Sequence, residues 1–399
     1  MTVKKVLNID EGKQTSAKNL YRNIGYVLIT VFIFLLSINM MGQAFNQLTE
    51  TAAQSILAAT SDPFVGLFIG LLITALIQSS SSSTTMIVAA VAVGSISFED
   101  AVPIIMGANI GTTITSSIVS LGYITKRNEF RKAIAAGAVH DIFNILTTII
   151  LFPLELKYHL LSRLSREIAS SLSAGDLFSK SGPIFNINTL LFDPISHWVS
   201  LWISQPIILL TLSFLVLIGC IKLLSNIIYK RLIGQSKVNF ENIVFNNPLK
   251  AFGWGTLLTA GIQSSSITTS LIVPLAATRK ISVQKAFNFI LGANVGTTIT
   301  AIIAALFKSE EAIAVAIAHL LFNLIGVLIF LPFPVIRRIP VKMAELLGKF
   351  TLRYRIVGFA YILLTFFIIP YSLILAHRSF TQTASPPVEL IDKKPIEEP

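Results

Sequence analysis

The chain of 399 residues is poor in charged side chains and has a single cysteine. Asp, Glu, Lys and Arg make up 13% of the residues, about half the share that soluble domains carry, which argues against a water-soluble enzyme. Intrinsic disorder is excluded as well, because 53% of the residues are apolar and disordered chains lack such residues. Cys220 has no partner for an intrachain disulfide or for a thiolate metal site.

The excess of positive charge lies in short clusters between apolar runs. The net charge is +11, and two of the clusters lie at 126–132 and 337–342. Such clusters are typical of membrane-protein loops on the cytoplasmic side, whereas a nucleic-acid-binding protein gathers its basic residues on one face. The charges therefore indicate a membrane protein without a nucleic-acid partner.

Several apolar stretches are long enough to cross a bilayer, which takes about 20 helical residues. The first follows a basic tail, residues 1–23, and no small-residue cleavage site comes after it, so we interpret it as an uncleaved span with a cytoplasmic N-terminus. We expect a multi-pass protein of the plasma membrane, the inner membrane in a bacterium. The predicted spans are 24–42, 99–122, 131–152, 201–224, 281–306, 311–334 and 353–376.

Two further apolar segments, 62–97 and 247–277, are each interrupted by a polar run. The runs extend from Gln78 to Thr85 and from Gln263 to Ser270. Unsatisfied polar groups facing lipid cost several kcal/mol each, so such an interruption must lie inside protein or beside a water-filled cavity. We predict that each segment is a re-entrant hairpin, with one helix, a polar tip and a returning helix.

Three motifs occur twice in the same order. Gln-Ser-Ser-Ser at 78 returns at 263, and Gly-Ala-Asn-x-Gly-Thr-Thr-Ile-Thr at 107 returns at 292, both with an offset of 185. His-x-x-Phe-Asn at 140 returns at 319, with an offset of 179. The chain therefore contains two copies of one unit, 24–152 and 201–334.

The number of crossings sets the relation between the copies. With the N-terminus inside, the first hairpin enters from outside and the second from the cytoplasm, so we predict an all-α membrane protein with two inverted-topology repeats. Each repeat has a re-entrant hairpin and a partly unwound span. An external connection, 153–200, contains an amphipathic helix at 158–172, and the final span is followed by a disordered tail, 377–399.

The repeated polar segments have the chemistry of an ion site. Inverted repeats with a broken segment in each half are typical of secondary transporters. Hydroxyl and backbone N–H donors at the two tips suit an oxyanion held between them. The glycines of the second motif let the backbone unwind, and its Asn and Thr oxygens then suit sodium. Close packing of helices is the alternative role of these glycines.

The combination of paired Gln-Ser-Ser-Ser tips, paired Gly-Ala-Asn-x-Gly-Thr-Thr segments and the His-x-x-Phe-Asn pair resembles the type II sodium/phosphate cotransporter family over about residues 60–335. The resemblance implies sodium-driven symport of inorganic phosphate, with sodium as the coupling ion, no other cofactor and no transition metal. It implies phosphate binding by Gln78, Ser79, Ser80, Ser81, Gln263, Ser264, Ser265 and Ser266. The sodium-site residues would come from Thr84, Thr85, Asn109, Thr112, Thr113, Asp141, Asn144, Thr268, Thr269, Asn294, Thr297, Thr298 and Asn323.

Two features of the third motif need separate treatment. His140 lies four residues before Asn144, and His319 before Asn323, so each pair shares a helix face; a satisfied buried polar pair is the favoured role of these histidines. Asp141, an acid in an apolar span, is replaced by Leu320 in the second copy. We hypothesise that Asp141 holds an extra sodium ion. The alternatives are that it holds a proton, or that it has a purely structural role near the basic cluster.

Other classes of protein remain as alternatives. An intramembrane serine hydrolase needs one activated serine with a histidine base, but the serine runs are duplicated and no Gly-x-Ser-x-Gly elbow is present. An ion channel is disfavoured, because a site that binds a polyatomic anion well is poorly suited to rapid conduction. A sodium-coupled carrier of sulfate or of a dicarboxylate is the closest rival, and we expect no enzyme activity.

Overall fold

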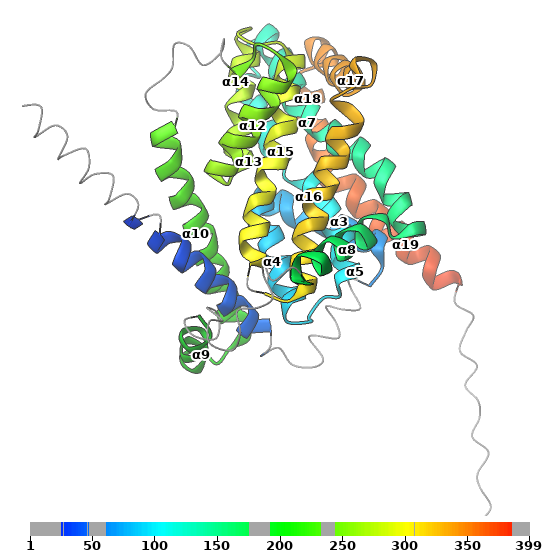
Figure 1. Cartoon of the computed structure of the whole chain (residues 1–399). Coiled ribbons are helices and arrows are strands. Elements are labelled where there is room, and N and C mark those ends of the chain that lie inside the picture. Colours follow the sequence, from blue (N-terminus) through cyan, green and yellow to red (C-terminus); the bar gives the residue numbers. More distant parts are fainter. Residues whose placement is uncertain are drawn as a thin grey trace, which may run out of the picture.

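The computed structural model of the chain describes residues 25–26, 28–45, 47, 61–174, 192–232, 244–306 and 308–384. All regular secondary structure in these ranges is helical (Figure 1). By length and composition, 6 of their helices can cross a membrane. These are Leu28–Phe45, Phe98–Leu121, Arg127–Tyr158, Val283–Ala305, Glu310–Phe330 and Ile356–His377. The predicted basic tail, 1–23, lies outside the described residues.

The helices follow the order of the two sequence copies. The first copy contains α3 (Pro63–Ile77), α4 (Ser80–Ala92), α5 (Phe98–Gly111), α6 (Ile114–Leu121) and α7 (Arg127–Tyr158). The connection contains α8 (Leu160–Ala174) and α9 (Asp193–Trp202). The second copy contains α10 (Pro206–Leu232), α12 (Pro248–Ile262), α13 (Ser265–Ser270), α14 (Ile272–Ala277), α15 (Val283–Ala305) and α16 (Glu310–Phe330). The chain continues with α17 (Pro334–Arg353), α18 (Ile356–Leu363), the π-helical turn Leu364–Ile368 and α19 (Ile369–Ala384).

Glycines bring the first helix of each tip segment into contact with the span that follows it. A side chain at Gly107 on α5 would overlap the carbonyl oxygen of Leu67 on α3, and one at Gly292 on α15 would overlap that of Phe252 on α12. The positions 107 and 292 differ by the repeat offset of 185, so the two copies pack in the same way. Small residues allow this close approach of helix backbones inside a membrane.

The span of the first copy is interrupted by two residues that keep right-handed helical dihedral angles, and the span of the second copy is not interrupted. Thr112 and Thr113 separate α5 from α6, whereas α15 is one continuous helix from Val283 to Ala305 through both of its glycines. The prediction of an unwound second span is therefore wrong. Gly292 and Gly296 meet the backbone of α12 instead, so they serve close packing, the alternative role.

Two predicted boundaries also differ. The span predicted at 201–224 does not start at 201, because α9 ends at Trp202 and α10 begins at Pro206, as expected where a proline disfavours helical geometry in the residue before it. At the other end, α19 continues to Ala384, so the tail predicted to be disordered is helical over 377–384. The first proline after this helix is Pro386, and nothing earlier forces the helix to end.

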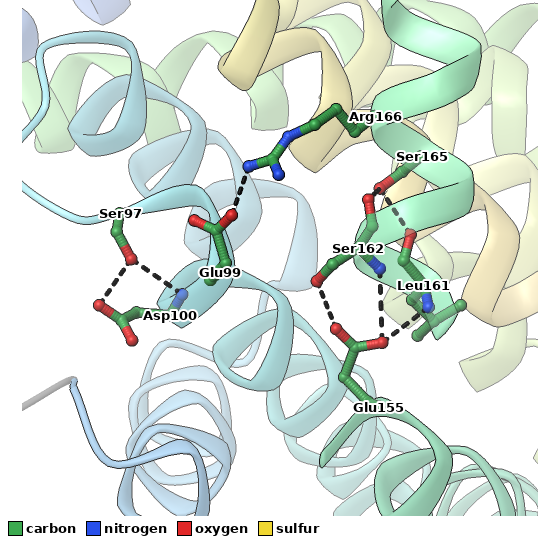
Figure 2. Close-up of polar contacts among 8 residues, drawn as sticks. All are labelled: Ser97, Glu99, Asp100, Glu155, Leu161, Ser162, Ser165 and Arg166. Carbon is green, nitrogen blue, oxygen red and sulfur yellow. Dashed lines mark hydrogen bonds and ion pairs between the residues drawn. The ribbon is translucent and has the colours of Figure 1, made fainter. Parts of the chain in front are cut away.

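The buried carboxylate of Glu155 joins α7 to α8. It accepts hydrogen bonds from the backbone N–H of Leu161 at 2.7 Å and from the N–H and hydroxyl of Ser162 (Figure 2). These amides belong to the first turn of α8 and have no acceptor within the helix, so Glu155 caps it. Arg166 of α8 also pairs with Glu99 of α5 (Figure 2). The predicted amphipathic helix at 158–172 is thus present as α8 and is fastened at two points.

We expect Gly292→Ala to destabilise the folded protein, because the added methyl group overlaps the backbone of α12 and overpacking of a core costs about 1–3 kcal/mol. The measurement is the melting temperature of the purified protein in detergent. Gly253→Ala on α12 is the matched control, since no atom lies within 4 Å of its added group. Equal melting temperatures for the two variants would contradict this packing.

Candidate functional site

The two Gln-Ser-Ser-Ser segments have the same backbone conformation. Gln78 ends α3 with φ 57° and Gln263 ends α12 with φ 55°, both in the left-handed region. The next residues, Ser79 and Ser264, are extended N-caps that accept a hydrogen bond from an amide three residues later. Each tip is therefore a two-residue break between the end of one helix and the start of another.

The two tips are in direct contact. The hydroxyl of Ser81 donates to the carbonyl oxygen of Gln263 at 3.1 Å, and the hydroxyl of Ser266 donates to that of Gln78 at 3.1 Å. Ser266 is the repeat counterpart of Ser81, and Gln263 that of Gln78, so the contact is the same when the copies are exchanged. This reciprocal pair of hydrogen bonds relates the two tips by a local twofold symmetry.

The same symmetry extends to the spans beside the tips. The hydroxyl of Thr300 on α15 lies 3.5 Å from that of Ser81, and the hydroxyl of Thr115 on α6 lies 3.4 Å from that of Ser266. Thr115 and Thr300 are the last residues of the second repeated motif. Each tip therefore contacts both the opposite tip and the span of the opposite copy.

Asparagine and histidine side chains form a second buried contact between the copies. His140 Nε2 lies 2.5 Å from Asn294 Oδ1, and Asn294 Nδ2 donates to Asn144 Oδ1 at 2.8 Å. In the reciprocal arrangement, Nε2 of His319 and Nδ2 of Asn323 lie 3.2 and 3.1 Å from Asn109 Oδ1. Each His-x-x-x-Asn pair therefore binds the Asn of the other copy. The expected role of a satisfied polar pair is met only in part, because Nδ1 of both histidines and Oδ1 of Asn323 are buried and have no hydrogen-bond partner within the described residues.

The threonines predicted for sodium fall into two groups. Five of them have a hydrogen-bond partner. Thr112 bonds to Ser80 of the first tip, and Thr269 bonds to Ser116 and to its own helix. The other three, Thr113, Thr268 and Thr298, bond to backbone carbonyls of their own segments. The hydroxyls of Thr84, Thr85 and Thr297, and of Ser265 in the second tip, are buried and have no hydrogen-bond partner within the described residues. An unpaired buried hydroxyl costs about 1–3 kcal/mol, and Thr74, Thr148 and Thr259 also carry such hydroxyls.

Asp141 follows His140 on α7 and bonds to hydroxyl groups. Its Oδ2 accepts hydrogen bonds from Ser117 at 2.7 Å and from the hydroxyl of Tyr361 at 2.9 Å. Its Oδ1 is buried and has no hydrogen-bond partner in the described part of the chain. The neighbour of Ser117, Ser116, bonds to Thr269 of the second tip segment at 2.9 Å, so this acid lies beside the tips.

The sequence did not identify five residues that take part in these contacts, namely Thr115, Ser116, Ser117, Thr300 and Tyr361. The two threonines lie within the repeated motif and were available from it. Ser116 and Ser117 have Ala301 and Ile302 at the corresponding positions of the second copy, so the repeat gave no signal for them. Tyr361 lies on α18, outside both copies, and only the folded chain brings it to Asp141.

The described part of the chain is an all-helical, multi-pass membrane protein whose polar side chains gather in contacts between two related halves. A family model, the Na+/Pi-cotransporter, matches residues 33–162 and 215–366. These ranges cover most of the chain, which therefore belongs to that family.

Curated relatives agree with this assignment. The sodium-dependent phosphate transport protein 2A of Ovis aries is 31% identical over 86% of this chain and 66% of its own length, and that of Rattus norvegicus is 30% identical over 85% and 65%. Protein 2B of Homo sapiens is 29% identical over 88% and 65%. The chain thus spans about two thirds of these relatives (65% and 66%). No solved structure matches it.

Replacement of Asn294 by Ala should lower stability, because it leaves the buried polar atoms of His140 and Asn144 without their partner, at about 1–3 kcal/mol per group. Chemical or thermal unfolding in detergent measures the change. Asn288→Ala on the same helix is the control, since Asn288 Oδ1 is buried and bonds to none of the residues that the structure describes. A loss as large in the control as in Asn294→Ala would argue against a specific contribution of the contact.

Proposed function

We propose that this chain is a secondary active transporter that carries inorganic phosphate into the cell together with sodium ions. Membership of the Na+/Pi-cotransporter family supports this activity, as do relatives named as sodium-dependent phosphate transport proteins. The observation that carries the proposal in the structure is the reciprocal hydrogen bonding of the two serine tips. It brings two sets of hydroxyl and amide donors, one from each copy, to a single place.

The phosphate is held between the tips by Gln78, Ser79, Ser80 and Ser81 of the first copy and Gln263, Ser264, Ser265 and Ser266 of the second. The hydroxyls of Ser81 and Ser266, which bond to backbone carbonyls across the interface, turn to the oxygens of the anion when it binds. α4 begins at Ser80 and adds amide donors and the positive end of its dipole. The tips bring no fixed positive charge, so the compensating charge must come with the substrate.

Sodium ions supply that charge. A phosphate with two negative charges that enters against an inside-negative potential meets about 2.3 kcal/mol per charge per 100 mV. The unpartnered hydroxyls of Thr84, Thr85 and Thr297 are oxygen ligands of the kind that sodium takes. Because sodium and phosphate attract each other in the same site, each raises the affinity of the other by the same factor.

The two copies form inverted repeats with re-entrant hairpins at their tips. The repeat offset, the identical tip geometry and the reciprocal contacts support this arrangement. A basic pocket brings Arg131 and Lys132 of α7 close to Lys349 of α17, and Figure 1 places α14 and α17 at one end of the molecule, with α8 and α9 near the other. By the positive-inside rule the end with the basic pocket, α14 and α17 is cytoplasmic. This orientation fits a protein of the plasma membrane, or bacterial inner membrane, with its N-terminus inside.

Transport then proceeds by alternating access. The Asn and His contacts hold the copies together, while separation of the tips on one side or the other opens the central site to one compartment at a time. No hydrogen bond between the described residues joins His140 or His319 to a serine of the tips, and Nε2 of each ring bonds to an asparagine instead. We therefore propose transport without enzyme activity.

Uptake of labelled phosphate into proteoliposomes tests the proposal. We expect uptake to require an inward sodium gradient, to fail with potassium, and to resist excess sulfate or succinate; inhibition by either competitor with little phosphate uptake would indicate a carrier of another anion instead. Ser81→Ala with Ser266→Ala should reduce uptake about tenfold or more, as loss of two hydrogen bonds to a charged ligand implies. Ser213→Ala, which removes a buried hydroxyl bonded within α10, should leave uptake intact.

Asp141→Asn should change the net charge moved per transport cycle. The buried Oδ1 of Asp141 has no hydrogen-bond partner among the described residues, so the carboxylate is suited to hold an additional sodium ion. The amide of Asn keeps an oxygen ligand but lacks the negative charge that offsets the charge of the ion. The measurements are the sodium dependence of uptake and the current in voltage-clamped vesicles. An unchanged current with an unchanged sodium dependence would refute this role.

A further inference from the structure

A pocket of about 260 Å³ lies between α7, α17 and the start of α15, away from the tips. Arg131 and Lys132 of α7 line it on one side, and Glu345 and Lys349 of α17 on another. Ser282 and Val283, at the start of α15, complete the wall. None of these residues belongs to the proposed transport site.

The positive charges of this pocket are not matched by carboxylates. Ion pairs in the described residues join Lys126 to Glu129, Arg166 to Glu99 and His377 to Asp62, and none includes Arg131, Lys132 or Lys349. Arg279 adds a further positive charge near Lys132, and Glu345 is the one acid that lines the pocket. Three or four cations around one acid repel each other, and a bound anion relieves that repulsion.

Backbone groups add to this attraction. α15 starts at Val283 and runs for 23 residues, and the hydroxyl of its N-cap, Ser282, accepts from the amide of Lys285 at 3.2 Å. The other amides of the first turn have no acceptor within the helix, and the positive end of the helix dipole points out of the same turn. A cavity lined by Arg, Lys and a helix N-terminus is a chemically complete site for a phosphate group.

We infer that this pocket binds a phosphate group at a second site, distinct from the transported phosphate and separate from the proposed transport cycle. Arg131 provides a planar fork for two phosphate oxygens, and Lys132 and Lys349 provide point charges. The group belongs either to the headgroup of an acidic phospholipid or to free inorganic phosphate. Exposed apolar residues of α17, among them Val335, Leu346 and Phe350, place a surface for acyl chains on the same helix.

Binding to the purified full chain in detergent tests the inference. The probes are phosphatidylglycerol, zwitterionic phosphatidylcholine and inorganic phosphate, with bound lipid counted by native mass spectrometry and bound phosphate by equilibrium dialysis. The dialysis uses potassium buffer and a Ser81→Ala/Ser266→Ala background, so that the tips do not contribute. This arrangement keeps the result independent of whether the chain transports phosphate.

The test variant is Arg131→Gln with Lys349→Gln, and the control is Arg338→Gln with Lys342→Gln, which removes the same charge from exposed positions outside the pocket. We expect the test variant to bind phosphatidylglycerol, or inorganic phosphate, about tenfold more weakly than wild type, since loss of two charge-assisted contacts exceeds 1.4 kcal/mol. The control should bind like wild type. Lys349→Gln alone, at an exposed position, repeats the test if the double variant unfolds.

The probe that responds identifies the source of the phosphate group. If the test variant loses only the binding of phosphatidylglycerol, with phosphatidylcholine binding unaffected, the pocket holds a lipid headgroup. If it loses only the binding of inorganic phosphate, the pocket holds the free ion. The inference is overturned if the test and control variants bind both anionic probes equally well, or if phosphatidylglycerol binds no better than phosphatidylcholine and inorganic phosphate does not bind.

Discussion

The structure depends on one constraint, which is that polar groups inside a membrane must find partners within the protein. The chain carries two runs of serine and threonine in segments that are otherwise apolar. Some of these hydroxyls bond within their own run, as Ser83 does to the carbonyl oxygen of Ser79. Others bond between the copies, because Ser81 donates to the carbonyl oxygen of Gln263 and Ser266 to that of Gln78. The requirement for hydrogen bonds thus holds the two halves together.

The same exchange recurs between asparagine and histidine side chains. Asn109 is hydrogen-bonded to His319 and Asn323 of the second copy. Asn294 is hydrogen-bonded to His140 and Asn144 of the first. These contacts are fully buried, which makes each of them costly to break singly. A molecule built in this way has a buried polar interface between its halves, and beside it lie hydroxyls that have no hydrogen-bond partner among the described residues.

The two halves are not equivalent, and they differ beside both tips. Asp141 has Leu320 as its counterpart, and the paired hydroxyls of Ser80 and Thr112 correspond to the unpartnered hydroxyls of Ser265 and Thr297. The first span is broken at Thr112 and Thr113, whereas α15 is continuous. A site shared by such halves has different ligands on its two sides, as a carrier of an anion with cations requires.

The sequence by itself determined the membrane environment, the duplicated unit and the polar residues at its tips, because hydropathy and exact repeats are properties of the residue order. It also identified Asp141, since an acid in an apolar span is conspicuous. Only the tertiary structure decided that α15 does not unwind, because Gly292 and Gly296 are compatible with both a break and a close contact. It alone brought Tyr361 and Ser117 to Asp141, since contacts between distant segments depend on how helices pack and leave no local pattern.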